Sequence, residues 1–284
     1  MARLMALWTL LSLFVSHSVA GGGKDPVPVN LGKVNTDADE DDPFIVTGNT
    51  QLLYASNKSG KFGIRIAQRS GKGFSAGKPI PDLNDKETDF RSPFMTRDFK
   101  LYFASNEVPD EKLKDLKNYD IKYRTQGRAP VIIPGISEKE DELYPWVTAN
   151  GKEMYFSRKS KDGFVLFVAR GPAMMPIGNA KEVGFPAGFH HATLSASGLV
   201  MYLQGPVAKD RVGLFRSKRS KAGAAWSKPE PLANLNSADA TRGDMSPCLS
   251  GDGKKLYFAS DRPQGQGGLD LWVVDTSGLK TTAE

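Results

Sequence analysis

Five short segments of the chain carry ionisable side chains just ahead of an apolar stretch. Carboxylates act as general acids and bases or accept hydrogen bonds, neutral imidazoles donate and accept them, and arginine donates to carboxylates and other acceptors. Such side chains gathered around one ligand would form a binding or catalytic site. The segments are residues 39–42, 89–91, 141–144, 189–191 and 242–244, and their candidate site residues are Asp42, Asp89, Arg91, Asp141, Glu142, Tyr144, His190, His191, Arg242 and Asp244.

Each segment leads into the same pattern of predicted strands. A strand opens at Pro43, Pro93, Pro145, Ala192 and Pro247, and an aromatic residue or leucine follows 10 or 11 residues later, at Tyr54, Phe103, Phe156, Leu203 and Phe258. Hydroxyl and Asx residues lie between the two positions, as is typical of a hairpin turn. A period of 47 to 55 residues with three or four short strands in each predicts a radial β-repeat.

The fifth repeat carries the most specific pattern. Residues 246–263 read SPCLSGDGKKLYFASDRP, and GGLDLW follows at residues 267–272. This pattern resembles the TolB-type, WD40-like β-propeller repeat. The resemblance implies a propeller fold, but it implies no single activity because such a fold serves many functions.

The last repeat ends too early to supply its own fourth strand. Residues 27–34 are similar to residues 78–84 and 229–236, which we expect to form outermost strands, where proline is tolerated. We therefore predict an all-β, five-bladed β-propeller of four-stranded antiparallel blades, closed by the N-terminal strand, which completes the last blade. The blades are expected near residues 43–84, 93–134, 145–188, 192–236, and 247–274 plus 27–34.

The N-terminus has the features of a secretory signal peptide. Arg3 precedes an apolar run, and small residues end at Ala20, so we expect cleavage of residues 1–20 and a single propeller domain over residues 21–284. The expected location is periplasmic or secreted, with no stable membrane insertion after cleavage. A retained N-terminal anchor is the alternative.

Charge and cysteine content narrow the possible functions. The 38 lysine and arginine residues exceed the 32 acidic ones only modestly and are spread over all five repeats, so we expect no nucleic-acid binding. Cys248 is the only cysteine, which excludes an internal disulfide. We interpret it as a small buried hydrophobe and not as a nucleophile, and we expect the protein to be a monomer.

The five ionisable segments should meet in the folded chain. In a propeller, the segments that lead into the innermost strands converge on one mouth of the central channel, where a ligand would find several polar groups. The alternative interpretation is structural: acidic residues before a strand can cap backbone donors or pair with Arg91 and Arg242 between blades.

Two functions remain open from these residues. The first is a non-catalytic binding or scaffold protein that recognises a protein or polysaccharide partner in the cell envelope. The second is hydrolytic, because Asp42-Pro43-Phe44-Ile45 followed by Leu53-Tyr54 is similar to the first blade of five-bladed glycoside hydrolases of the arabinanase type. That resemblance implies Asp42 as a base. The reaction also needs a second carboxyl group as an acid, for which Asp89, Asp141 and Glu142 are candidates. The fourth repeat departs from it, since His190-His191 replace the glutamate of such families.

No cofactor is expected. The acidic run at residues 37–42 offers oxygen ligands for calcium, but it lacks a glycine-pivoted loop with ordered ligand spacing. His190 and His191 are adjacent, so on a regular strand they would point to opposite faces and could not chelate one metal together.

Overall fold

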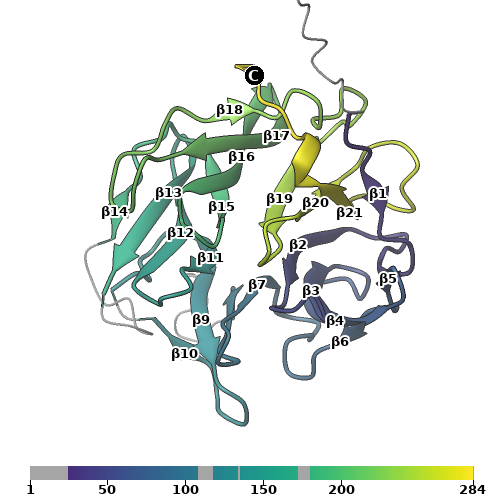
Figure 1. Cartoon of the computed structure of the whole chain (residues 1–284). Helices are drawn as coiled ribbons and strands as arrows, with labels where there is room; N and C mark the ends of the chain where they lie inside the picture. The colour runs from purple at the N-terminus through teal and green to yellow at the C-terminus, as the bar shows by residue number, and fades with distance from the viewer. Residues whose placement is uncertain (1–24, 108–117, 134, 172–179, 284) are drawn as a thin grey trace, which may run out of the picture.

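The computed structural model describes residues 25–107, 118–133, 135–171 and 180–283. Five antiparallel sheets surround a central axis (Figure 1). In four of them the strand nearest that axis comes first in chain order, whereas the fifth also has a strand from the N-terminal part of the chain at its outer edge. The prediction of a five-bladed propeller with four-stranded blades is confirmed. The predicted signal peptide, residues 1–20, lies outside the described residues.

The blades, from the innermost strand outward, have the following bounds. Blade 1 contains β2 (Glu40–Ile45), β3 (Gln51–Ser56), β4 (Gly63–Ser70) and β6 (Lys78–Pro79), with the short β5 (Gly73–Phe74) also paired to β4. Blade 2 contains β7 (Phe90–Met95), β8 (Leu101–Ser105), β9 (Asp120–Arg124) and β10 (Val131–Ile132). Blade 3 contains β11 (Glu142–Val147), β12 (Glu153–Ser160), β13 (Gly163–Arg170) and β14 (Lys181–Glu182). Blade 4 contains β15 (His190–Leu194), β16 (Val200–Ala208), β17 (Arg211–Lys218) and β18 (Glu230–Pro231). Blade 5 contains β19 (Asp244–Leu249), β20 (Lys255–Ser260), β21 (Asp270–Asp275) and, from the N-terminal part of the chain, β1 (Val29–Asn30).

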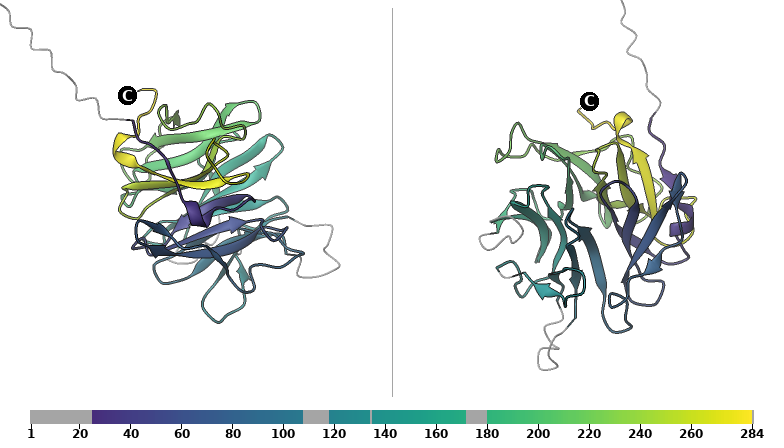
Figure 2. Two further views of the ribbon diagram at one scale, coloured as in Figure 1. Left: turned by 90° about the vertical axis from the view of Figure 1, so that its right-hand side faces the viewer. Right: turned by 60° about the horizontal axis from the view of Figure 1, so that its bottom comes forward.

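The ring is closed as predicted. β1 pairs with β21, so that Val29 lies opposite Val273, and Figure 2 shows the N-terminal strand beside the last blade. Asn35 extends the junction: its Oδ1 accepts a hydrogen bond from the Leu271 amide at 2.8 Å, and its Nδ2 donates to the Leu271 carbonyl at 3.0 Å. The two parts of the chain therefore form one blade, and β21 is not left as an unpaired edge strand.

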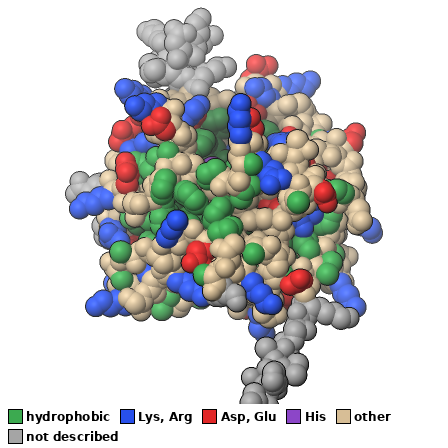
Figure 3. All heavy atoms as spheres, turned by 90° about the horizontal axis from the view of Figure 1, so that it is seen from above, with side chains coloured by type: hydrophobic (Ala, Val, Ile, Leu, Met, Phe, Trp, Pro, Cys, Tyr) green, Lys and Arg blue, Asp and Glu red, His purple; other side chains and the backbone are tan. Residues whose placement is uncertain are grey.

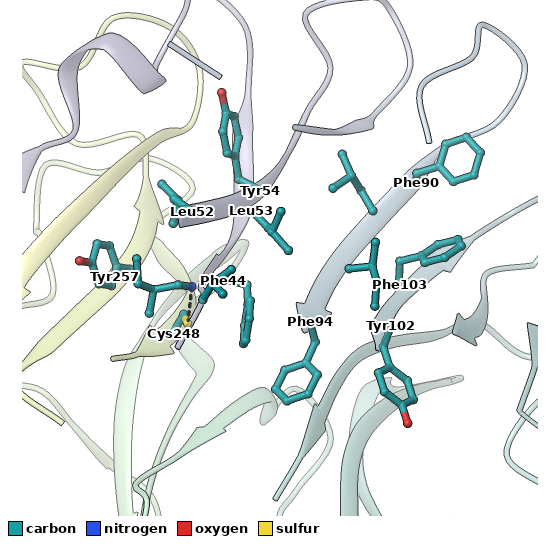
Figure 4. Packing of buried hydrophobic residues seen from close by; sticks show 14 of the residues in the cluster. Phe44, Leu52, Leu53, Tyr54, Phe90, Phe94, Tyr102, Phe103, Cys248 and Tyr257 are labelled. Atoms are coloured by element: carbon teal, nitrogen blue, oxygen red, sulfur yellow. Dashed lines mark hydrogen bonds between the residues drawn. The ribbon is translucent and has the colours of Figure 1, made fainter. Parts of the chain in front are cut away.

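The core lies between neighbouring blades and is built from the three inner strands of each. Leu53, Tyr54 and Phe103 are buried, and Phe44 contacts Phe94 across the boundary between blades 1 and 2, with ring centroids 4.8 Å apart (Figure 4). Cys248 belongs to this core, as expected, and its Sγ accepts the Ile45 amide at 3.5 Å. Burial raises the pKa of the Cys248 thiol to about 12, which makes it a poor nucleophile.

The outer surface shows a mixed charge pattern. On the face drawn in Figure 3, lysine and arginine side chains are scattered and lie among acidic ones, without one continuous basic groove. No helix in the described part of the chain is long and apolar enough to span a membrane.

Candidate functional site

The innermost strand of every blade has the same β-bulge. Its register with the second strand shifts just before the proline position, and the residue there has a positive φ of 51 to 59°. None of the five is glycine, although side chains disfavour this backbone conformation. We call them the ring residues: Asp42, Ser92, Tyr144, His191 and Ser246.

The expectation that His190 and His191 point to opposite faces of the strand is wrong because of the bulge. Adjacent residues on a regular strand point to opposite faces, but the rings of His190 and His191 both pack against Tyr144, with centroids 5.4 and 3.9 Å away. Asp41 and Asp42 likewise both contact Arg91. A bulge inserts one residue into the strand, so two consecutive side chains reach the same side.

Blades 1, 2 and 5 are joined by a charged network in the channel. Arg91 donates through Nη2 to Asp41 Oδ2 at 2.5 Å and through Nε to Asp42 Oδ2 at 3.2 Å. The Ser92 amide also donates to Asp42 Oδ2, at 2.9 Å, and the Ser246 hydroxyl donates to Asp41 Oδ1 at 2.6 Å. Each carboxylate thus has partners on a neighbouring blade.

This network holds two carboxylates for one guanidinium. Burial and the adjacent Asp42 raise the pKa of Asp41, and Arg91 only partly opposes this. Burial would lower the pKa of Arg91, but Asp42 and Asp41 outweigh it, so that its pKa lies above the ordinary value. The guanidinium carbon also lies 4.3 Å from the centroid of the Phe62 ring, so Arg91 is held by both charge and stacking.

Blades 3 and 4 contribute a neutral, aromatic side of the channel. The Ser246 amide donates to Gln204 Oε1 at 2.9 Å, which leaves the Gln204 Nε2 group, 3.0 Å from His190 Nε2, as the donor to that ring. His190 Nε2 is then an acceptor, and the proton of the neutral ring resides on Nδ1. Burial lowers the pKa of both His190 and His191 to about 3, so both rings are neutral at pH 7.

Unpartnered polar atoms gather on this neutral side. Among the described residues, His190 Nδ1, His191 Nδ1 and Trp146 Nε1 are buried without a hydrogen-bond partner. His191 is only 9% exposed, and with Trp146 and Asp42 it lines a cavity of about 30 Å³. A volume of about 10 to 15 Å³ is enough to hold one water molecule, so the cavity is large enough for a water-sized group.

The cavity lies between two layers of side chains. The ring residues other than Ser246 form one, and the residues two positions further along each inner strand form the other, which we call the floor residues. Within the floor, the Phe94 and Trp146 rings contact edge to face at 5.1 Å, and Thr193 Oγ1 accepts the Leu249 amide at 3.1 Å. The floor residues are Phe44, Phe94, Trp146, Thr193 and Cys248.

Three carboxylates at the mouth act as clamps between blades. Asp39, Asp89 and Asp141 each accept a backbone N–H from the start of the third strand of the preceding blade, at 2.7, 2.9 and 3.0 Å. Each also pairs with a cation, at 2.8, 3.1 and 3.2 Å for Arg242, Lys61 and Lys159 respectively. Their oxygens are therefore used in holding neighbouring blades together.

Glu142 and Asp244 have structural contacts within their own blades. Glu142 is fully buried, accepts Arg158 Nε at 2.8 Å and accepts the Glu138 amide at 3.2 Å. Burial still outweighs these contacts and raises the pKa of Glu142 to about 7. Asp244 is bound in the same way, by Arg262 Nη2 and by the Ser237 amide.

The predicted site residues therefore fall into two groups. Asp42, Arg91, Tyr144, His190 and His191 meet at the channel, whereas Asp89, Asp141, Glu142, Arg242 and Asp244 hold the surrounding backbone.

Several channel residues were not predicted from the sequence. Ser92 and Ser246 directly precede a proline, as Asp42 does, so alignment on the proline would have found them. Asp41, Gln204 and Trp146 carried no such signal, because only the bulge and the pairing of the strands bring them to the channel.

The acidic run considered for calcium gives no metal centre by geometry. Within the ranges that the structure describes, no three histidine, cysteine, aspartate or glutamate side chains are grouped so that they could hold a metal ion. The oxygens of Asp41 and Asp42 face Arg91, Ser92 and Ser246.

No family model and no curated protein matches the sequence. Solved structures do resemble it. A thermostable family-43 glycoside hydrolase matches with a TM-score of 0.62 at 11% identity, over 89% of this chain and 96% of that chain. The catalytic domain of the GH62 α-L-arabinofuranosidase of Coprinopsis cinerea gives 0.59 at 11% identity, over 85% and 92%. The putative TolB of Agrobacterium tumefaciens gives 0.53 at 12% identity, over 89% and 86%.

At these identities the similarity shows a shared propeller fold and no shared activity. The TolB-type resemblance of the fifth repeat is therefore matched by structural similarity, but TolB is one of several kinds of propeller that this chain resembles. The function has to be argued from the channel itself.

Proposed function

We propose that the protein is an exported, non-catalytic binding propeller that recognises a glycan of the cell envelope at its channel mouth. The observation that carries this proposal is the composition of the channel. Aromatic rings from blades 3 and 4, the anchored guanidinium of Arg91 and unpartnered polar atoms converge there. Flat aromatic surfaces beside a few fixed polar groups are suited to a ligand with apolar faces and polar edges, such as a sugar ring.

The small number of carboxylates that line the cavity argues against catalysis. Hydrolysis of a glycosidic bond ordinarily uses two carboxyl groups on opposite sides of the scissile bond. The residues that line the cavity include one carboxylate, Asp42, and its Oδ2 already accepts from Arg91 and Ser92. Glu142, a candidate acid, is fully buried against Arg158 and cannot touch a substrate in this arrangement.

Binding to immobilised polysaccharides tests the proposal. The panel comprises neutral, amino and acidic glycans, and the Tyr144→Asn variant should lose retention at least tenfold, because asparagine tolerates the positive φ while the aromatic surface is removed. Phe99→Asn is a matched control, since Phe99 also has a positive φ, is 69% exposed and lies in the turn at the other end of an inner strand. No retention of any glycan by the wild type, or equal retention by Tyr144→Asn, would contradict the proposal.

A hydrolase is the second candidate, favoured by the position of Asp42 in the inner strand of the first blade, at the channel. If it is correct, the wild type releases sugar from a retained polysaccharide and Asp42→Asn abolishes the release. Measurement of reducing ends on the same panel separates the two functions, because the binding proposal expects retention with no product.

A further inference from the structure

We propose that the small cavity beneath the ring residues is a subsite for one neutral hydroxyl group of the bound sugar, so that the mouth selects neutral glycans over amino and acidic ones. This inference rests on the proposed glycan-binding function and specifies its ligand. It starts from the cavity, which is lined by side chains of both the ring and the floor.

The size of the cavity admits a small polar group. Its volume of about 30 Å³ exceeds the roughly 10 to 15 Å³ that one water molecule needs. A hydroxyl, an ammonium or a water molecule would fit. Hydrogen bonding distinguishes among these.

The lining of the cavity offers a ligand both a donor and an acceptor. Trp146 Nε1 can only donate, and it is buried without a partner. Asp42, on the same lining, offers a carboxylate that accepts. A hydroxyl satisfies both, whereas an ammonium donates only and would leave the Trp146 N–H unpaired, at the cost of a buried, unsatisfied donor.

His191 can serve a hydroxyl in either direction. Its ring is neutral, stacks on Tyr144 at 3.9 Å and has an unpartnered Nδ1. Because one nitrogen of a neutral imidazole donates and the other accepts, the ring can adopt the tautomer that the hydroxyl requires. The sugar ring that carries this hydroxyl would then lie at the mouth beside Tyr144 and Arg91.

Charge disfavours acidic sugars. The channel wall carries Asp41 and Asp42 against the single Arg91, and neither His190 nor His191 adds a positive charge at neutral pH. A uronate brought to this wall would meet like charge that nothing in the described channel offsets.

The test compares glycan classes and one nearly isosteric variant. The panel holds neutral glycans (β-glucan, mannan, galactan, arabinan and xylan), an amino glycan (chitosan) and acidic glycans (polygalacturonate and alginate), measured by affinity electrophoresis at pH 7. We expect retention by one or more neutral glycans only. Trp146→Phe should weaken that retention about tenfold, because it removes the N–H but keeps a ring against Phe94.

Each outcome decides between the two proposals. If chitosan or an acidic glycan is retained as well as the neutral ones, or if Trp146→Phe binds like the wild type while Tyr144→Asn does not, the hydroxyl subsite is wrong and glycan binding stands. If no glycan is retained, the proposed function fails and the subsite fails with it. A urea unfolding curve for Trp146→Phe guards against a folding defect, and if that variant is unfolded, preferential retention of neutral glycans by the wild type still decides the inference.

Discussion

The two sides of the channel share the same β-bulge but carry different kinds of side chain on it. In blades 1 and 2 the bulge carries Asp41, Asp42 and Arg91, whose charged atoms are bound to one another and to the two ring serines. In blades 3 and 4 it carries Tyr144, His190 and His191, which are neutral at pH 7 and retain unpartnered nitrogens. The charged groups thus satisfy one another, whereas the nitrogens on the aromatic side can still form hydrogen bonds with a ligand.

The charged side of the channel therefore stabilises the fold, whereas the aromatic side can bind a ligand. A buried ion pair is costly to break and holds its partners in place, so the charged side fixes the position of Arg91. The unpartnered atoms of the aromatic side are the groups from which a ligand can gain hydrogen bonds. The rim is divided differently: blades 1 to 3 have the clamps Asp39, Asp89 and Asp141, while Gly188 and Gly243 occupy the equivalent positions in blades 4 and 5.

Removal of the guanidinium should have the largest effect. Arg91→Met leaves two buried carboxylates without their counter-charge, so we expect the free energy of unfolding at pH 7 to fall by about 3 kcal/mol in urea titrations. Lys61→Met is the control, because the exposed pair of Lys61 with Asp89 should contribute less than about 1 kcal/mol. Equal losses in the two variants would mean that the buried pairs of Arg91 stabilise the fold no more than an exposed ion pair does.

A fall in pH should destabilise the protein because His191, on the aromatic side, is held neutral in the folded state. The folded pKa of His191 is about 3, whereas an unfolded histidine titrates near 6.5, so the unfolded chain gains a proton first as the pH falls and stability is lost below about pH 6.5. His191→Phe keeps a ring on Tyr144 but cannot be protonated. It should reduce the loss of stability between pH 7 and pH 5 by about 2 kcal/mol.

The measurement is chemical denaturation of both proteins at pH 7, 6 and 5. Asp41 and Arg91 are the charged groups that act on His191, and both remain in the variant, so their own titration largely cancels in the comparison. Phe99→Asn should keep the full pH dependence of the wild type. An unchanged slope in His191→Phe would show that His191 is not held neutral by burial.

Backbone strain in the ring should have the smallest effect. Ser92 has a φ of 55°, a conformation that is costly for alanine and free for glycine. Both substitutions remove the same hydroxyl, so Ser92→Gly should be more stable than Ser92→Ala by about 1 kcal/mol in thermal or urea unfolding. If alanine is the more stable residue at this position, the bulge is not strained there.

The fold followed from the sequence because its signals are local and repeated. The same pattern recurs five times: an inner-strand position that is proline in four of the repeats, a turn of hydroxyl and Asx residues, and an aromatic residue or leucine 10 or 11 residues after that position. Each signal acts within a few residues. The similarity of residues 27–34 to the outer strands also predicted the closure, which β1 and β21 confirm.

The sequence alone also determined that ionisable segments would meet at one mouth, since strand order and the propeller fold require it. Tertiary structure decided which of those side chains reach the channel. A bulge reverses the side to which a residue points, so His190 and His191 share a face that strand alternation denied them. Whether a carboxylate such as Asp42 or Asp141 faces the channel or a neighbouring backbone amide depends on contacts between chain-distant blades, and no local pattern encodes such contacts.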